Sequence, residues 1–191
     1  MRWSVAAALA LLLAASGPGT AAESESDMPD RATLGEFVPA AQPAPAPAIS
    51  LADTSGQTIE LSALRGKPVI INLWATWCEP CLREMPSLER LQSRFGERIA
   101  VLAVSEDRGG DKTVEPFIAK LGLKSVKICI DPNSEIGHAF AVRGLPTSLL
   151  IDRNGMVLGR VEGAAEWDSP KILGVLQPLL PEDSVIKASS R

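Results

Sequence analysis

The sequence predicts an α/β fold in which a sheet of mixed strand direction is flanked by helices. Short apolar runs alternate with segments of helical periodicity through the middle of the chain, and a hairpin pattern followed by one more helix closes it. The 191 residues give room for one ordinary domain with terminal extensions, and the 46% apolar and 22% charged content is that of a globular protein. A net charge of −4 supplies no basic field, so no nucleic-acid partner is expected.

The first elements expected are a β-hairpin and a buried central strand. Residues 49–51 and 58–61 flank a turn-rich cluster at 53–56, which predicts an N-terminal hairpin. Residues 69–74 then form a nearly continuous apolar run, which is typical of a strand buried on both faces.

Helices and strands alternate after this strand. Apolar residues at helical spacing predict a helix that ends at Gly96, and a second helix ends at Gly122. The periodic positions of the first helix are Met85, Leu88, Leu91 and Phe95. The other expected elements are strands at 99–104, 126–130, 148–151 and 156–161, helices at 113–121, 134–141 and 168–179, and a turn at 152–155.

Both ends of the chain are expected to lie outside the folded domain. Residues 1–22 have the three-part pattern of a secretory signal peptide, and cleavage near Ala22 is favoured over an uncleaved membrane anchor. Residues 23–47 are rich in Pro and Ala and predict an extended tether. The domain is expected over residues 48–180, followed by a polar tail over 181–191.

The strongest functional signal is the run Cys78-Glu79-Pro80-Cys81, at the expected start of a helix. Two cysteines at this spacing can form a small disulfide ring, and backbone N–H groups together with the helix dipole stabilise a thiolate on the first one. A thiolate is the attacking species in disulfide exchange, and the second cysteine then resolves the mixed disulfide. The pattern therefore predicts a redox-active disulfide between Cys78 and Cys81, with no other cofactor.

The same cysteine spacing is also half of a zinc site, so a metal centre is an alternative. The remaining candidate ligands are Cys129 and the single histidine, His138, which stand at no recognisable ligand spacing. No metal site is therefore expected. Cys129 falls in a predicted strand and is interpreted as a small buried hydrophobe, with pairing between molecules as the alternative.

Further segments accompany the cysteine pair in a specific combination. They are the strand at 69–74, the site at 77–81, the run at 83–86, the tripeptide at 145–147 and the hairpin at 150–155. Together they resemble the thioredoxin superfamily, and within it the TlpA/ResA-like branch of membrane-associated or periplasmic reductases. The resemblance covers about residues 48–180 and implies a thioredoxin fold with an added central strand–helix element, which residues 112–130 match.

The resemblance assigns roles to particular residues. It implies catalytic roles for Cys78, Cys81, Glu84 and Pro146, and substrate contacts by Trp77, Glu79, Pro80, Leu145 and Thr147. Pro146 is expected to follow a cis peptide bond, to lie against the disulfide and to help bind extended substrate backbone.

A proton-handling group is also expected close to the cysteines. Thioredoxin carries a buried Asp in the strand before its cysteines, where this chain has Asn72, which cannot exchange a proton. Glu84 lies about one helical turn after Cys81 and is the candidate for this role. The alternative is a solvated glutamate in the first turns of a helix.

The expected function is a thiol–disulfide oxidoreductase that reduces disulfides of client proteins in the periplasm. Negative charge from Glu79 and Glu84 disfavours a nearby thiolate, and a less stabilised thiolate makes a poorer oxidant and a better reductant. The alternatives are a dithiol oxidase or isomerase, and a copper-binding assembly module that uses Cys78 and Cys81 as soft ligands.

The resemblance also implies partners. A membrane thiol transporter would supply electrons, and the clients would include apocytochrome c or the copper-site assembly factors of cytochrome oxidase. The cytochrome-c-maturation branch usually has Glu where this chain has Thr147, which favours the general TlpA-like type. The protein is expected to be a monomer, exported to the periplasm or anchored to the inner membrane.

Overall fold

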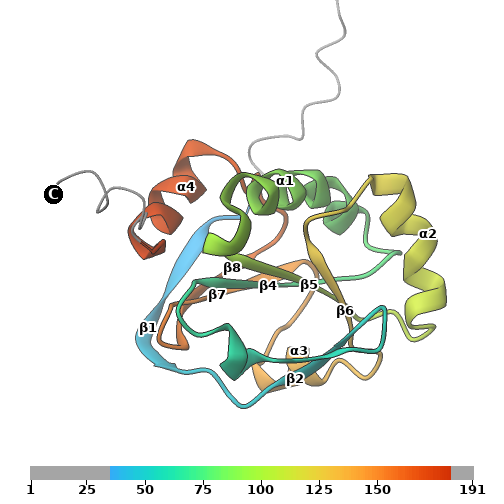
Figure 1. The fold of residues 1–191 in the computed structure, drawn as a ribbon, viewed down its shortest axis with the longest axis horizontal. Helices are drawn as coiled ribbons and strands as arrows, with labels where there is room; N and C mark the ends of the chain where they lie inside the picture. Colours follow the sequence, from blue (N-terminus) through green and yellow to red (C-terminus); the bar gives the residue numbers. More distant parts are fainter. Residues whose placement is uncertain (1–34, 182–191) are drawn as a thin grey trace, which may run out of the picture.

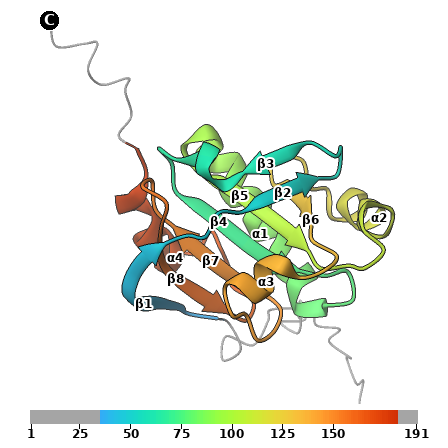
Figure 2. The same ribbon diagram turned by 90° about the horizontal axis from the view of Figure 1, so that it is seen from below.

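The structure is a computed structural model and describes residues 35–181. The strands of this region form one sheet in the order β1-β8-β7-β4-β5-β6-β2-β3 (Figures 1 and 2). The strands are β1 (Phe37–Pro45), β2 (Ser50–Asp53), β3 (Thr58–Glu60), β4 (Val69–Trp74), β5 (Ala100–Ser105), β6 (Lys127–Ile130), β7 (Thr147–Ile151) and β8 (Met156–Glu162). The α-helices are α1 (Glu79–Phe95), α2 (Asp111–Leu121), α3 (Glu135–Ala139) and α4 (Pro170–Leu176).

The sheet is mixed, as the sequence predicts. Strand β5 pairs in parallel with β4 on one side and with β6 on the other, whereas the remaining pairs are antiparallel. Helices α1, α2 and α4 pack on one face of the sheet, and α3 packs on the other (Figures 1 and 2). All six residues of β4 are therefore buried, which explains the continuous apolar run. The carboxyl end of β4 leads directly into the cysteine pair.

The predicted N-terminal hairpin is present as β2 and β3. The carboxylate of Asp53 holds its turn, because Oδ1 accepts the backbone N–H groups of Ser55 and Gln57, each at 2.9 Å. Strand β2 also pairs with β6, so the hairpin extends the sheet beyond the inserted element, which is formed by α2 and β6.

The prediction of a tether over residues 23–47 is wrong for its second part. Residues Phe37–Pro45 form β1, an edge strand that pairs antiparallel with β8. Most side chains of β1 are exposed, so the strand is held mainly by backbone hydrogen bonds. A Pro/Ala-rich composition does not predict such backbone pairing. Gly159 of β8 permits the close approach, since a Cβ atom there would lie 2.3 Å from the carbonyl oxygen of Val38.

Several predictions about the termini lie outside the described residues. They are the signal segment at 1–22, the first part of the tether at 23–34 and all but the first residue of the polar tail at 181–191. Within residues 35–181, no helix is long and apolar enough to cross a membrane.

Candidate active site

The two cysteines form a disulfide at the start of α1. Cys78 is the N-cap residue of this helix, and its Sγ accepts the backbone N–H of Cys81 at 3.3 Å. Pro80 lies in the first turn of α1, where backbone N–H groups make no intrahelical hydrogen bond, so its lack of an N–H costs the helix nothing. Cys78 is 6% exposed and Cys81 is completely buried, so Cys78 is the sulfur that a partner reaches first.

The loop between β4 and Cys78 is fixed by a buried carboxylate. Asp107, which follows β5, accepts the backbone N–H of Thr76 at 2.8 Å and its hydroxyl at 2.7 Å. Ser105 donates its own hydroxyl to the same carboxylate at 2.8 Å. The next residue, Trp77, is 71% exposed. The backbone of this loop is therefore fixed by hydrogen bonds, while the indole of Trp77 is exposed to solvent next to Cys78 in the chain.

The peptide bond between Leu145 and Pro146 is cis, as expected. Pro146 immediately precedes β7, and Thr147 pairs across the sheet with Leu73, near the end of β4 that leads to the cysteines. Thr147 itself is buried, and its hydroxyl donates to the carbonyl oxygen of Gly144 at 2.8 Å. The prediction that Thr147 contacts substrate stays a prediction, and the buried side chain leaves its backbone as the group that could make the contact. The Thr147 hydroxyl fixes the turn that carries the proline.

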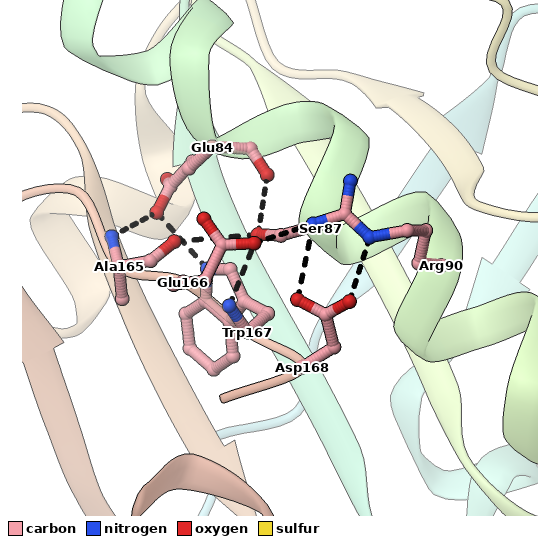
Figure 3. Close-up of polar contacts among 7 residues, drawn as sticks. All are labelled: Glu84, Ser87, Arg90, Ala165, Glu166, Trp167 and Asp168. Atoms are coloured by element: carbon pink, nitrogen blue, oxygen red, sulfur yellow. Dashed lines mark hydrogen bonds and ion pairs between the residues drawn. The ribbon is translucent and has the colours of Figure 1, made fainter. Parts of the chain in front are cut away.

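Glu84 is buried, with an exposed fraction of 2%, so the alternative of a solvated glutamate is wrong. Its Oε1 accepts from Asn72 Nδ2 at 2.7 Å. Its Oε2 accepts from the backbone N–H of Ala165 at 2.8 Å and from the indole Nε1 of Trp167 at 2.9 Å (Figure 3). Burial raises the pKa of Glu84 to about 7, and the bonds from Trp167, Ala165 and Asn72 oppose that rise.

The segment that supplies two of these donors, residues 165–168, lies across α1 and is fastened along one helix face (Figure 3). Ser87 accepts the backbone N–H of Trp167 at 3.0 Å. One turn further, Arg90 binds Asp168 at 2.6 Å and also pairs with Glu166. Glu84, Ser87 and Arg90 recur every three residues, so one face of α1 holds the whole segment.

The remaining sequence-predicted residues lie at or near the helix start. Glu79 is exposed and pairs with Arg83 at 3.1 Å, and Pro80 is half-buried. Cys129 is completely buried in β6, and burial raises the pKa of its thiol to about 12, which fits the small-hydrophobe interpretation. In residues 35–181, no three His, Cys, Asp or Glu side chains are grouped so that they could hold a metal ion.

Sequence reasoning did not identify the residues that support the site from elsewhere in the chain. Asp107, Ser148, Ala165 and Trp167 all bind the site from loops or strands distant in sequence. One signal was available: a tryptophan in a loop of a chain that has only 4 Trp and no Tyr.

A disulfide at a helix start after a central strand, with a cis-proline preceding the strand beside it, defines the thioredoxin-fold class of thiol–disulfide oxidoreductases. The sequence comparison agrees. The profile of the AhpC/TSA family matches residues 43–159, and the chain belongs to this family.

Similar proteins and solved structures include two that are named for this activity and one that is named a thioredoxin. The thiol-disulfide oxidoreductase ResA of Bacillus thuringiensis (strain Al Hakam) is 36% identical over 137 residues, which cover 71% of this chain and 77% of that protein. A thiol-disulfide oxidoreductase from Bacteroides fragilis NCTC 9343 is 28% identical with a TM-score of 0.61, covering 72% of this chain and 100% of that one. The exposed lipoprotein thioredoxin of Streptococcus pneumoniae strain TIGR4 has the same identity and TM-score, covering 70% and 100%. The protein is a thiol–disulfide oxidoreductase.

Proposed function

We propose that the protein works as a reductant of client-protein disulfides outside the cytoplasm. In the reduced protein, the Cys78 thiolate attacks one sulfur of a client disulfide, and the other client sulfur leaves as a thiolate. Cys81 then attacks Cys78 and releases the second client sulfur. Two electrons pass to the client, and the Cys78–Cys81 disulfide seen in the structure is the oxidised product.

The observation that carries the proposal is the difference in exposure between the two sulfurs. Cys78 retains a small exposed area at the N-cap of α1, whereas Cys81 is shielded behind it. A client can therefore form its mixed disulfide with Cys78, while Cys81 remains protected until it resolves the intermediate. This asymmetry fits exchange with a protein partner better than storage of a structural disulfide.

Glu84 supplies the proton-handling group of this mechanism. Cys81 must lose a proton before it attacks, and Glu84 is buried about one turn further along α1 with a pKa raised to about 7. A carboxyl with that pKa can accept the proton near neutral pH and later return it. When it is ionised, its negative charge disfavours a second anion nearby, which raises the thiol pKa and favours the reducing direction.

Clients dock along the surface beside the cis-proline. Pro146 is buried and its carbonyl oxygen accepts the N–H of Gly163 at 2.9 Å, so an extended client segment would pair with the backbone of Leu145, which is half-buried. Trp77, which precedes Cys78 in the chain, offers an exposed apolar face. Glu79 and Pro80 border the same helix start, and they complete the proposed contact surface.

The compartment and the electron donor follow from the same proposal. A reductant that works in an oxidising compartment needs continuous re-reduction, so we assign a membrane thiol transporter as donor. The signal-peptide pattern at residues 1–22 and the likeness to an exposed lipoprotein support a periplasmic location. Clients of the proposed type are apocytochrome c and copper-site assembly factors of cytochrome oxidase, and a monomer suffices for the exchange.

A trapping experiment tests the proposal. The reduced Cys81→Ser variant is mixed with a peptide that contains a disulfide, and adducts are measured by mass spectrometry under non-reducing conditions. We expect a stable mixed disulfide on Cys78, because the resolving sulfur is missing. The matched Cys78→Ser variant should form no adduct, since Cys81 is buried. Equal adduct formation in both variants, or none in either, would refute the proposal.

A further inference from the structure

Asn72 occupies an unusual position at the centre of the sheet. It lies in β4 and is completely buried. Its Nδ2 donates to two acceptors, Glu84 Oε1 at 2.7 Å and Ser148 Oγ at 2.9 Å. Its Oδ1 has no hydrogen-bond partner among the described residues. A buried amide oxygen without a partner is unfavourable, so the arrangement needs an explanation.

All three hydrogen-bond partners of the Glu84 carboxyl are donors, which favours the ionised carboxylate. Oε2 accepts from the backbone N–H of Ala165 and the indole N–H of Trp167, and neither group can accept a proton in return. Oε1 accepts from Asn72 Nδ2, which is also a donor. In the present arrangement a proton on either oxygen would therefore have no hydrogen-bond acceptor among these partners. Of the three partners, only Asn72 has an acceptor atom that a side-chain rotation can bring forward.

A half-turn of the Asn72 amide exchanges its oxygen and nitrogen. Oδ1 would then face Glu84 Oε1 and Ser148 Oγ, and it could accept a hydrogen bond from each hydroxyl. The serine can make this change because its hydroxyl both donates and accepts. The amide makes two hydrogen bonds to these two partners in either orientation, so their number does not favour one of them.

We propose that Asn72 is a positioning residue whose side-chain amide reverses when Glu84 gains or loses a proton. Oε1 of Glu84 thereby keeps a hydrogen-bond partner in both protonation states, deep in the protein and away from water. The inference rests on the proposed function, in which Glu84 exchanges a proton during the thiol reaction. In this account Asn72 moves no proton itself.

The groups packed around Glu84 indicate that uncharged partners, and not nearby charges, control its protonation. Strands β4 and β7 contribute Asn72 and Ser148, which are direct partners across the sheet. The 165–168 segment contributes Ala165 and Trp167, together with Glu166 and Asp168, whose charges pair with Arg90 of α1. Desolvation raises the pKa of Glu84, and hydrogen bonds from three uncharged donors lower it.

The reversal of the Asn72 amide also affects β7, the strand that begins beside the proposed client surface. Ser148 is two residues beyond Pro146 on β7, and its hydroxyl must change from acceptor to donor when the amide reverses. The protonation state of Glu84 on α1 is thus connected through β4 to the strand that starts at the cis-proline.

Nuclear magnetic resonance on the full-length, isotope-labelled protein tests the inference directly. The side-chain carboxyl carbon of Glu84 and the side-chain amide group of Asn72 are followed between pH 5 and 9 in the wild type. We expect the Asn72 amide signals to change with the same midpoint as Glu84, near the raised pKa of about 7. Contacts from the amide protons to Ser148 should be present at high pH and absent at low pH. Amide protons that keep the same neighbours while Glu84 titrates would overturn the inference.

Two matched substitutions separate a reversing amide from a fixed donor. Trp167→Phe removes a donor whose hydrogen bond is stronger to the ionised carboxylate than to the neutral acid, so the pKa of Glu84 should rise by about one unit. Asn72→Leu removes a partner from both protonation states, so the shift should be less than half of that. A rise in Asn72→Leu of half the Trp167→Phe rise or more would identify Asn72 as a fixed donor.

The readouts distinguish failure of the inference from failure of the proposed function. If the amide stays fixed but the wild type reduces protein disulfides, only the role of Asn72 is refuted. If the amide reverses but no disulfide is reduced, the switch exists and the proposed function is wrong.

Discussion

Trp167 donates its indole N–H to Glu84 over 2.9 Å, although the two residues lie 83 positions apart in the chain. The contact forms because the chain returns across α1 after β8 and is held there by Ser87 and Arg90. It removes Glu84 from water while providing a donor for its ionised form. The proton affinity of this carboxyl therefore depends on a segment that no local pattern around the cysteines includes.

The first prediction concerns stability and pH. The pKa of Glu84 is raised from the ordinary 4.5 to about 7 in the folded protein, so the folded state binds more protons than the unfolded state between these values. The contribution of Glu84 to stability is therefore complete below about pH 4.5 and is lost as pH rises through about 7. Over this window we expect the wild type to lose about 3 kcal/mol relative to Glu84→Gln. Urea unfolding of the oxidised proteins at several pH values measures the difference.

The matched control for this measurement is Glu97→Gln, because the Glu97 side chain is 97% exposed. It should follow the pH dependence of the wild type between pH 5 and 7. Parallel stability curves for the wild type and Glu84→Gln would show that Glu84 carries no raised pKa.

The second prediction concerns the rate of disulfide exchange. Glutamine keeps the shape of Glu84 and an oxygen for Trp167, but it cannot accept a proton. We expect Glu84→Gln to slow resolution of the mixed disulfide by about a hundredfold, the lower range of general acid–base catalysis. The pH–rate profile of peptide-disulfide reduction should also lose its inflection near 7. An unchanged profile would remove Glu84 from the mechanism.

The third prediction concerns the loop before Cys78. Asp107→Ala leaves the backbone N–H of Thr76 and the hydroxyl of Ser105 without their acceptor. We expect a loss of stability of about 1–3 kcal/mol, measured by urea unfolding, because these donors lose their buried acceptor. Thr76→Val is the matched variant, since it removes one hydroxyl and keeps the N–H bond. A larger effect in Thr76→Val than in Asp107→Ala would contradict the assigned role of the carboxylate.

The fourth prediction concerns client recognition. Trp77 is 71% exposed, so Trp77→Ala should change the free energy of unfolding by no more than about 0.5 kcal/mol. We expect kcat/KM for a protein disulfide to fall by about tenfold, the effect of losing an aromatic contact, and kcat/KM for cystine to stay unchanged. Val38→Ala, at another exposed apolar residue, is the control and should affect neither. Equal losses on both substrates would point to a change at the disulfide instead.

The elements around the cysteines could be predicted because local sequence determines them. The apolar run of β4 reports burial on both faces, and the spacing of Met85, Leu88 and Leu91 reports one buried face of α1. The strand β1 could not be predicted in this way. Its pairing with β8 uses backbone groups, which every residue except proline provides in full.

The site residues also fall into those that local sequence predicts and those that depend on tertiary contacts. The roles of Cys78, Cys81 and Glu84 were suggested by motif spacing, and their placement on α1 agrees with it. The partners of Glu84 come from β4 and from the 165–168 segment, where hydrogen bonds depend on how distant parts of the chain pack. Spacing therefore located the carboxyl, while its burial and its raised pKa required the tertiary structure.

The reduction potential of the Cys78–Cys81 pair tests the central claim most directly. The protein is equilibrated with glutathione and dithiothreitol buffers at pH 7, and the fraction of free thiols is counted by alkylation and mass spectrometry. The account predicts a potential nearer to about −270 mV, the value of thioredoxin, than to about −120 mV, the value of a strong oxidase of this fold. A potential close to the oxidase value would contradict it, because the protein would then take electrons from its clients.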